Sequence, residues 1–233
     1  MFTYKIKSGD YRYYDISIII EESDVIGQTG EMVDLGLPSG TKWADRNVGA
    51  SRPDDDGIYF AWGETKGFYE SERVFDEKHL VVSERIRKCD NVLDPRDDAA
   101  TMNWGNDWRM PTKDEMKELL DNCKIEYAAV CNSNWSVRSS GFLITSKIND
   151  NSIFFPATGQ IDGTECLNHG IECYYWTASP SNNLNNLECA YNLFIRGYDK
   201  YEIIYPRRCY MDICSNGDFF LGCSIRPVKR IND

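Results

Sequence analysis

Apolar residues recur at helical spacing in the middle of the chain, directly after a recognisable helix start. The segment from Thr112 to Glu115 (TKDE) is a capping box, in which the first and last side chains satisfy backbone amides of the first turn. Four apolar residues then fall at i, i+3, i+4 and i+7: Met116, Leu119, Leu120 and Cys123. The pattern predicts an amphipathic helix that docks by one stripe.

A second helix start lies upstream. Asp94 stands before Pro95, which is favoured at the first helical position, and Asp97 complements the exposed amides of a first turn. Apolar residues follow at Ala99, Ala100 and Met102. We therefore expect a helix that begins at Pro95 with Asp94 as its cap.

Bulky residues lie between the two predicted helices. Aromatic side chains at such a position can bridge a helix to a sheet. We expect one core cluster at that junction, formed by Trp104, Trp108, Met116, Leu119 and Leu120.

The rest of the pattern is typical of short strands broken by glycine and proline. An alternating segment occurs near the start, and further strand-like segments follow along the chain: 14–18, 41–48, 57–62, 173–179 and 222–228. We expect residues 1–30 to form a strand or leader element, and residues 31–233 to form one mostly β domain. A chain of 233 residues that is 42% hydrophobic can bury a core of that size.

The net charge of the chain restricts the kinds of partner that we expect. The net charge is −11 and the pI is near 4.7, whereas nucleic-acid-binding proteins usually carry a basic face, so we expect no nucleic-acid partner. No apolar run approaches the roughly 18 residues of a spanning helix, and no hydrophobic signal core follows Met1. We expect no transmembrane segment. The localisation stays open, and display on a cell surface or a phage particle is compatible with the sequence.

The nine cysteines occur without a CxxC motif and with only two histidines, which argues against structural zinc. A disulfide framework stays open, but most of these thiols are expected to be reduced and buried. Asp54 to Asp56 lacks the regular spacing of a calcium loop and is more typical of a solvated turn. We predict no metal, no cofactor and no catalytic residue.

Several motifs together resemble one family, the Fibrobacter succinogenes major paralogous domain family of gut bacteria. They occur in order between about residues 31 and 228, at 33–44 (VDLGLPSGTKWA), 47–50 (NVGA), 59–64 (YFAWGE), 93–100 (LDPRDDAA), 108–112 (WRMPT) and 224–228 (SIRPV). The resemblance implies an α+β, C-type-lectin-like fold, with twisted antiparallel sheets, two helices and a long, loop-rich C-terminal half. That architecture is shared with formylglycine-generating enzymes and with retroelement-diversified variable proteins.

The relationship to variable proteins implies a ligand-binding module with a C-terminal binding face. Adenine-directed mutagenesis in such proteins leaves surface positions occupied by residues such as Asn, Tyr, Asp, Ser and Arg. The chain has this composition at Asn182, Asn183, Asn185, Asn186, Tyr198, Asp199, Tyr201, Tyr205, Arg207, Tyr210, Asp212, Asn216 and Asp218. Tyr and Arg are enriched in binding hot spots, and Asn supplies adaptable hydrogen bonds. The implied partner is a protein or glycan on another cell or particle.

Alternatives remain at this point. Asn-rich loops are common turns, and tyrosine is ordinary in strands, so the segment is also compatible with plain loop structure. A structural or adhesin-tip assembly domain is the main rival function. A third reading is a copper oxidase, because Cys209 and Cys214 have the CxxxxC spacing of formylglycine-generating enzymes, and thiolates suit Cu(I).

Overall fold

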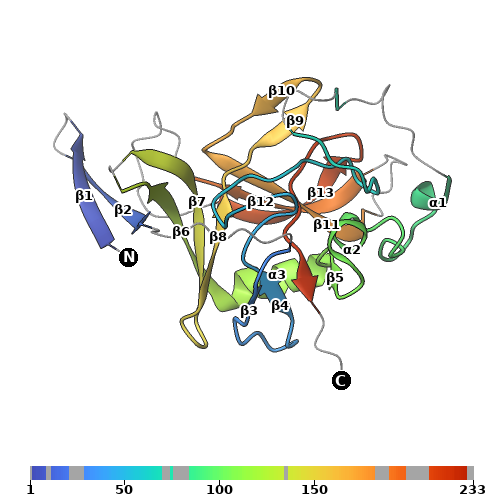
Figure 1. Cartoon of the computed structure of the whole chain (residues 1–233), viewed down its shortest axis with the longest axis horizontal. Coiled ribbons are helices and arrows are strands. Elements are labelled where there is room, and N and C mark those ends of the chain that lie inside the picture. Colours follow the sequence, from blue (N-terminus) through green and yellow to red (C-terminus); the bar gives the residue numbers. More distant parts are fainter. Residues whose placement is uncertain are drawn as a thin grey trace.

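The computed structural model is a mixed, sheet-rich α+β structure (Figure 1). For residues 2–8, 12–20, 85 and 210–217 it describes the backbone only. The described residues are 2–8, 12–20, 29–69, 74–75, 84–133, 136–181, 189–197 and 210–229.

The strands form several small sheets. The largest has the order β1 (Phe2–Ser8), β2 (Arg12–Ile20), β6 (Cys123–Cys131), β7 (Val137–Ser146) and β8 (Ser152–Pro156). A three-stranded sheet contains β11 (Glu172–Pro180), β12 (Cys189–Arg196) and β13 (Tyr210–Asp218). A third has the order β3 (Met32–Val33), β4 (Lys42–Ala44), β14 (Val228–Lys229) and β5 (Trp108–Arg109), and a hairpin joins β9 (Gln160–Asp162) to β10 (Glu165–Leu167).

Two of these strand predictions hold closely. The alternating 14–18 segment lies within β2, and the 173–179 segment lies within β11. Two other strands are shorter than predicted. The 41–48 segment contains only the three-residue β4, and the 57–62 segment contributes isolated bridges at Tyr59 and Phe60. The described part of the C-terminal half contains the strands β6 to β14, and pairing with neighbours satisfies the backbone even of polar segments such as β13.

Among the strands that the structure describes, the pairings within sheets are antiparallel except for one. Strand β2 pairs with β6 in parallel, with Ser17 opposite Ala128 and Ile20 opposite Cys131. A parallel pair needs a long crossover, and more than a hundred residues separate these strands, so the chain has ample length for it. The segment 1–30 thus contributes β1 and β2 to the edge of the largest sheet.

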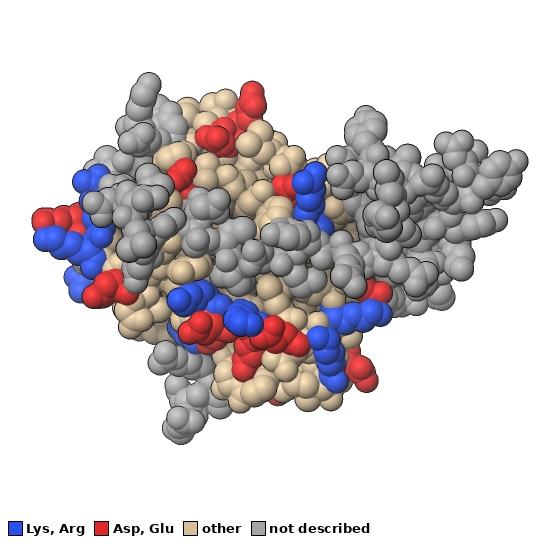
Figure 2. All heavy atoms as spheres, turned by 180° about the vertical axis from the view of Figure 1, so that it is seen from behind, with Lys and Arg blue, Asp and Glu red and all other residues tan. Residues whose placement is uncertain are grey.

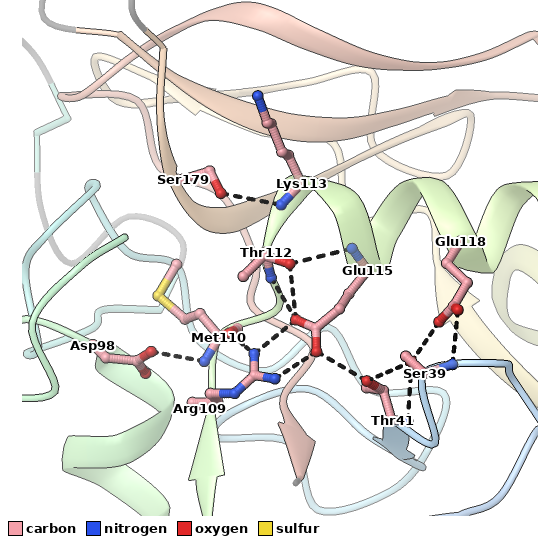
Figure 3. Close-up of polar contacts among 10 residues, drawn as sticks. All are labelled: Ser39, Thr41, Asp98, Arg109, Met110, Thr112, Lys113, Glu115, Glu118 and Ser179. Atoms are coloured by element: carbon pink, nitrogen blue, oxygen red, sulfur yellow. Dashed lines mark hydrogen bonds and ion pairs between the residues drawn. The ribbon is translucent and has the colours of Figure 1, made fainter. Parts of the chain in front are cut away.

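Helix α3 (Lys113–Asn122) begins at the predicted capping box. The Glu115 amide donates to the Thr112 hydroxyl at 3.2 Å, and the Thr112 amide donates to Oε2 of Glu115 at 2.9 Å (Figure 3). Met116 and Leu119 are fully buried. The helix ends where Cys123 takes up the extended backbone of β6.

Helix α2 (Ala99–Trp104) starts later than expected, so the cap prediction was wrong. Its cap is Asp98, whose Oδ1 accepts the Thr101 amide at 2.9 Å and whose Oδ2 accepts the Met110 amide at 2.8 Å. Asp94 instead pairs with the Arg96 guanidinium, and its carbonyl accepts the Asp97 amide in a turn. Pro95 therefore begins a turn and not a helix. Ahead of it lies the single helical turn α1 (Glu84–Arg87).

The sheet β11–β12–β13 separates two cores. Tyr175 and Leu193 belong to a cluster that α3 completes with Met116 and Leu119, whereas Trp176 belongs to a second cluster. Successive strand residues alternate between faces, so Tyr175 and Trp176 lie on opposite sides. Both faces of β11 and β12 are therefore largely buried.

The expected junction cluster of tryptophans and α3 residues was wrong. Trp104 packs against the second cluster, while Leu120 packs against the first, with Met116 and Leu119. Trp108 is buried and makes an edge contact with Trp104 at 5.3 Å between ring centroids. The residues expected to form one cluster are therefore divided between different clusters.

Charged side chains are mixed on the surface. Seen from behind, basic and acidic residues lie side by side in the coloured part of the view (Figure 2). In the residues that the structure describes, no helix is long and apolar enough to cross a membrane.

Candidate functional site

The hairpin β12–β13 organises the candidate binding residues. At one end of it Arg196 is opposite Tyr210, and at the other end Cys189 is opposite Asp218. Residues 198–209 join the two strands at the Arg196 end, whereas residues 182–188 enter β12 at the Cys189 end. Eight strand residues span about 23 Å, so the two candidate segments leave the sheet far apart.

The structure describes part of the candidate set. Nine of these residues lie outside the described residues: Asn182, Asn183, Asn185, Asn186, Tyr198, Asp199, Tyr201, Tyr205 and Arg207. Tyr210, Asp212 and Asn216 belong to β13, of which the backbone is described, and Asp218 has a half-buried side chain. The expectation of an exposed patch that includes Tyr198, Tyr201 and Tyr205 stays a prediction.

The register divides the candidates into two groups. Tyr210 and Asp212 are at the Arg196 end of β13, together with the attachment of residues 198–209. Asn216 and Asp218 are near the Cys189 end, together with the attachment of residues 182–188. We call the end of the hairpin that contains Tyr210 and Asp212 the Arg196 end, and the end that contains Asn216 and Asp218 the Cys189 end.

A buried carboxylate fixes the Arg196 end. Glu172, at the start of β11, is 4% exposed, and its Oε2 accepts hydrogen bonds from Asn168 Nδ2 at 2.8 Å and from the Tyr174 hydroxyl at 2.9 Å. Its Oε1 lies 3.3 Å from Nε of Arg196, which is opposite it on β12. Several charge-assisted contacts therefore hold the carboxylate.

Aromatic residues adjoin this ion pair. Tyr174 is opposite Phe194 on the neighbouring strand, and their ring centroids are 4.9 Å apart. In the next strand, Asp212 is opposite Phe194 and Tyr210 is opposite Arg196. Tyr210 thus lies in the same cross-strand row as Glu172, and Asp212 lies in the same row as Tyr174.

The sequence analysis missed Glu172, Tyr174, Phe194 and Arg196. The strand-like segment 173–179 predicted the strand that holds Tyr174, but cross-strand partners depend on register. A single sequence does not reveal which residue of β12 stands opposite Glu172.

Close packing marks the point where the chain leaves β12. The Gly197 amide donates to the Ile171 carbonyl at 2.8 Å, and a Cβ on Gly197 would lie 2.6 Å from Cδ2 of Tyr127. The Tyr127 hydroxyl in turn donates to the Gly170 carbonyl at 2.6 Å. The base of the 198–209 segment is therefore held against β6 and the start of β11.

The Cys189 end contains a buried thiol. Sγ of Cys189 donates to Oδ1 of Asp218 at 3.2 Å. Burial, together with the hydrogen bond and charge of Asp218, raises the pKa of Cys189 to about 12. This thiol is protonated at neutral pH, so it is a poor nucleophile and a poor metal ligand.

A hollow of about 180 Å³ lies beside the same end of the hairpin. Lys113 at the start of α3 forms one wall, and its Nζ lies 4.8 Å from the centre of the Tyr191 ring. The Lys113 amide donates to the Ser179 hydroxyl at 3.1 Å, which ties the helix to β11 (Figure 3). Asp90 and Asn91 also line it.

Each of the three aspartates at 54–56 pairs with a basic side chain or a histidine. Asp54 pairs with Arg138, Asp55 accepts from Arg52, and Asp56 lies 2.7 Å from Nε2 of His169. The described residues contain no group of three or more His, Cys, Asp or Glu side chains that could hold a metal ion.

One of the two cysteines in the copper hypothesis lies outside the described residues. Cys209 is one of the residues that the structure does not describe, and Cys214 is a backbone position of β13 opposite Asn192. No disulfide joins the cysteines whose side chains the structure describes: Cys89, Cys123, Cys131, Cys166, Cys173, Cys189 and Cys223.

Comparisons with known proteins do not assign the chain to a family. No family model, curated protein or solved structure matches the chain. The resemblance of residues 31–228 to the Fibrobacter succinogenes major paralogous domain family therefore rests on the motifs quoted above.

Proposed function

We propose that this protein is a ligand-binding module with a C-type-lectin-like fold, and that its binding face lies at the Arg196 end of β12–β13. The face comprises Tyr198, Asp199, Tyr201, Tyr205, Arg207, Tyr210 and Asp212. Its ligand is a protein or glycan on another cell or particle. The face is diversified by a retroelement, which makes these residues the part of the chain that differs between variants.

The arrangement of the short strands supports the fold proposal. Val228 of β14 is opposite both Trp43 of β4 and Arg109 of β5, so the last motif pairs with two earlier ones. The motifs on which the resemblance rests thus pair with one another in one sheet, as expected if they form a common scaffold.

One observation carries the binding proposal. The candidate segment 198–209 starts and ends at the paired residues Arg196 and Tyr210, in a sheet whose β11 and β12 strands are buried on both faces. We therefore propose that the side chains between that pair can be replaced without loss of the fold. Binding residues on loops held by a rigid scaffold are a common arrangement.

The test is to replace Tyr198, Asp199, Tyr201, Tyr205 and Arg207 together. With alanine at all five positions, we expect the thermal midpoint to change by less than about 4 °C, which corresponds to roughly 1 kcal/mol or less for a domain of this size. The same positions, randomised in a displayed library, should yield binders to an arbitrary protein such as lysozyme. Loss of the fold in the alanine variant, or a library without binders, contradicts the proposal.

The rival, an assembly domain, makes a different prediction. If the face contacts further copies of this chain, sedimentation should show an oligomer that the five-alanine variant loses. Sequencing the DNA beside the gene tests diversification separately, because a near-identical template repeat is required for it.

A further inference from the structure

We propose that the hollow lined by the start of α3 and by β11 and β12 binds a small zwitterion, an α-amino acid with an apolar side chain. In this site the Lys113 ammonium holds the carboxylate of the ligand, and the carboxylates of Asp90 and Asp114 hold its ammonium. The site contains no residue of the Arg196 end. It therefore goes beyond the proposed function and is tested separately from it.

The hollow is small. Its volume of about 180 Å³ is below the roughly 300 Å³ at which sites for drug-sized molecules begin. The lining comes from three places in the chain: residues 90–92 before α2, residues 112–114 at the start of α3, and Ser179, Pro180 and Tyr191 of β11 and β12. A compact molecule bound there therefore contacts three separate segments.

Charges of both signs line the hollow. Lys113 and Asp114 are consecutive residues in the first turn of α3, and Asp90 precedes α2. Within the described part of the chain, none of these three side chains takes part in an ion pair or a hydrogen bond. Lys113 points away from Glu115 (Figure 3), and its Nζ lies 4.8 Å from the centre of the Tyr191 ring. An exposed contact of that kind leaves the donors of the ammonium available to a ligand.

The mixture of charges selects the class of ligand. A charge inside a hollow of this size lies within roughly one Debye length, about 8 Å, of the charges that line it. An anion is attracted by Lys113 and repelled by the two carboxylates, whereas a cation experiences the reverse. A molecule with both charges can place each beside its opposite. A free α-amino acid is a small molecule of this kind.

The apolar part of the lining selects the side chain of the ligand. Val92 lines the hollow and is 41% exposed, although it is a large apolar residue. Pro180 and Tyr191 add further apolar surface to the lining. An apolar side chain that covers these residues removes apolar area from water, which favours binding. Leucine is therefore the probe.

The experiment records amide NMR spectra of the full ¹⁵N-labelled chain during titration with leucine. We expect a dissociation constant on the order of 1 mM, because the ligand is small, with shifts at the amides of residues 90–92 and 112–114. N-acetylleucine lacks the ammonium and leucinamide lacks the carboxylate, so each should bind at least fivefold more weakly. No shifts at about twenty times the expected constant, or equal binding of either analogue, would overturn the inference.

Variants assign each charge to its partner. Lys113→Ala should weaken leucine at least fivefold without weakening leucinamide, which has no carboxylate for the ammonium to hold. Asp90→Asn combined with Asp114→Asn should weaken leucine at least fivefold without weakening N-acetylleucine. An equal loss for leucine and for the matching analogue would show that the variant acts through the fold, and would contradict the assignment.

Lys117→Ala is the matched control. Lys117 is an exposed lysine one turn further along α3, paired with Asp121 and outside the lining of the hollow. This variant should bind leucine within twofold of the wild type. A loss equal to that of Lys113→Ala would show that leucine binds elsewhere, and would overturn the inference while leaving the proposed function intact.

Discussion

Gly197 lies directly against the ring of Tyr127, where an added Cβ would be only 2.6 Å from Cδ2. The same added atom would lie 3.1 Å from the Ile171 carbonyl oxygen, which accepts the Gly197 amide. The residue at the base of the candidate segment is thus restricted by β6 as well as by its own hairpin.

Gly197→Ala should destabilise the protein by about 1–3 kcal/mol, because the methyl group overpacks a site that has no room for it. Denaturant unfolding measures the change. Gly163→Ala is the control, since a Cβ there meets nothing within 4 Å and the cost comes from its positive φ alone. A neutral Gly197→Ala would show that Tyr127 can move aside freely.

The correction of the α2 cap gives a second prediction. Asp98→Ala should cost about 2 kcal/mol or more, because it removes the cap of Thr101 and leaves the buried Met110 amide without its acceptor. Asp94→Ala should cost less than about 0.5 kcal/mol, since its pair with Arg96 is exposed. The reverse order of the two effects, measured by denaturant unfolding, would restore Asp94 as the cap.

The pKa of Glu115 predicts that part of the stability of the fold is lost in acid. Burial by itself raises the pKa of this carboxyl, but hydrogen bonds from Arg109, Thr112 and Thr41 outweigh burial and lower the pKa to about 2, against a usual value of 4.5 (Figure 3). A carboxyl with a lowered folded-state pKa stabilises the fold above its unfolded pKa. That contribution is lost as the pH falls from about 4.5 towards 2.

The lost contribution is roughly 3 kcal/mol at most. Unfolding free energies at pH 7 and pH 3 should therefore differ less in Glu115→Gln than in the wild type. Glu118→Gln, which changes a half-buried neighbour that accepts from Ser39, is the control and should retain the wild-type difference. Equal pH dependence in wild type and Glu115→Gln would rule out this role for Glu115.

The two cysteines of the copper hypothesis give the last prediction. Replacing Cys209 and Cys214 with serine should leave the thermal midpoint within about 4 °C, because in a diversified segment they are residues that this variant happened to receive. We expect the wild-type chain not to bind Cu(I) stoichiometrically, which titration against a chromogenic chelator measures. Tight binding that the double variant loses, with oxidation of a cysteine peptide, would instead favour the enzyme.

Much of the local structure was readable because it depends on neighbours in the sequence. The capping box from Thr112 to Glu115 satisfies amides within one turn, so four consecutive residues were enough to locate α3. The strand β11 was likewise apparent from residues 173–179. The cap of α2 was misplaced because Asp94 and Asp98 are both acceptable caps, and the choice depends on the Met110 amide, which is distant in sequence.

The sequence by itself determined that this protein is an acidic α+β domain with a polar, tyrosine-rich segment near its C-terminus. The tertiary structure decided which residues accompany that segment. Strand register placed Glu172 opposite Arg196, and the packing of β6 placed Tyr127 against Gly197. Register and packing depend on how whole sheets are buried in the protein. The sequence around residues 198–209 therefore does not reveal them.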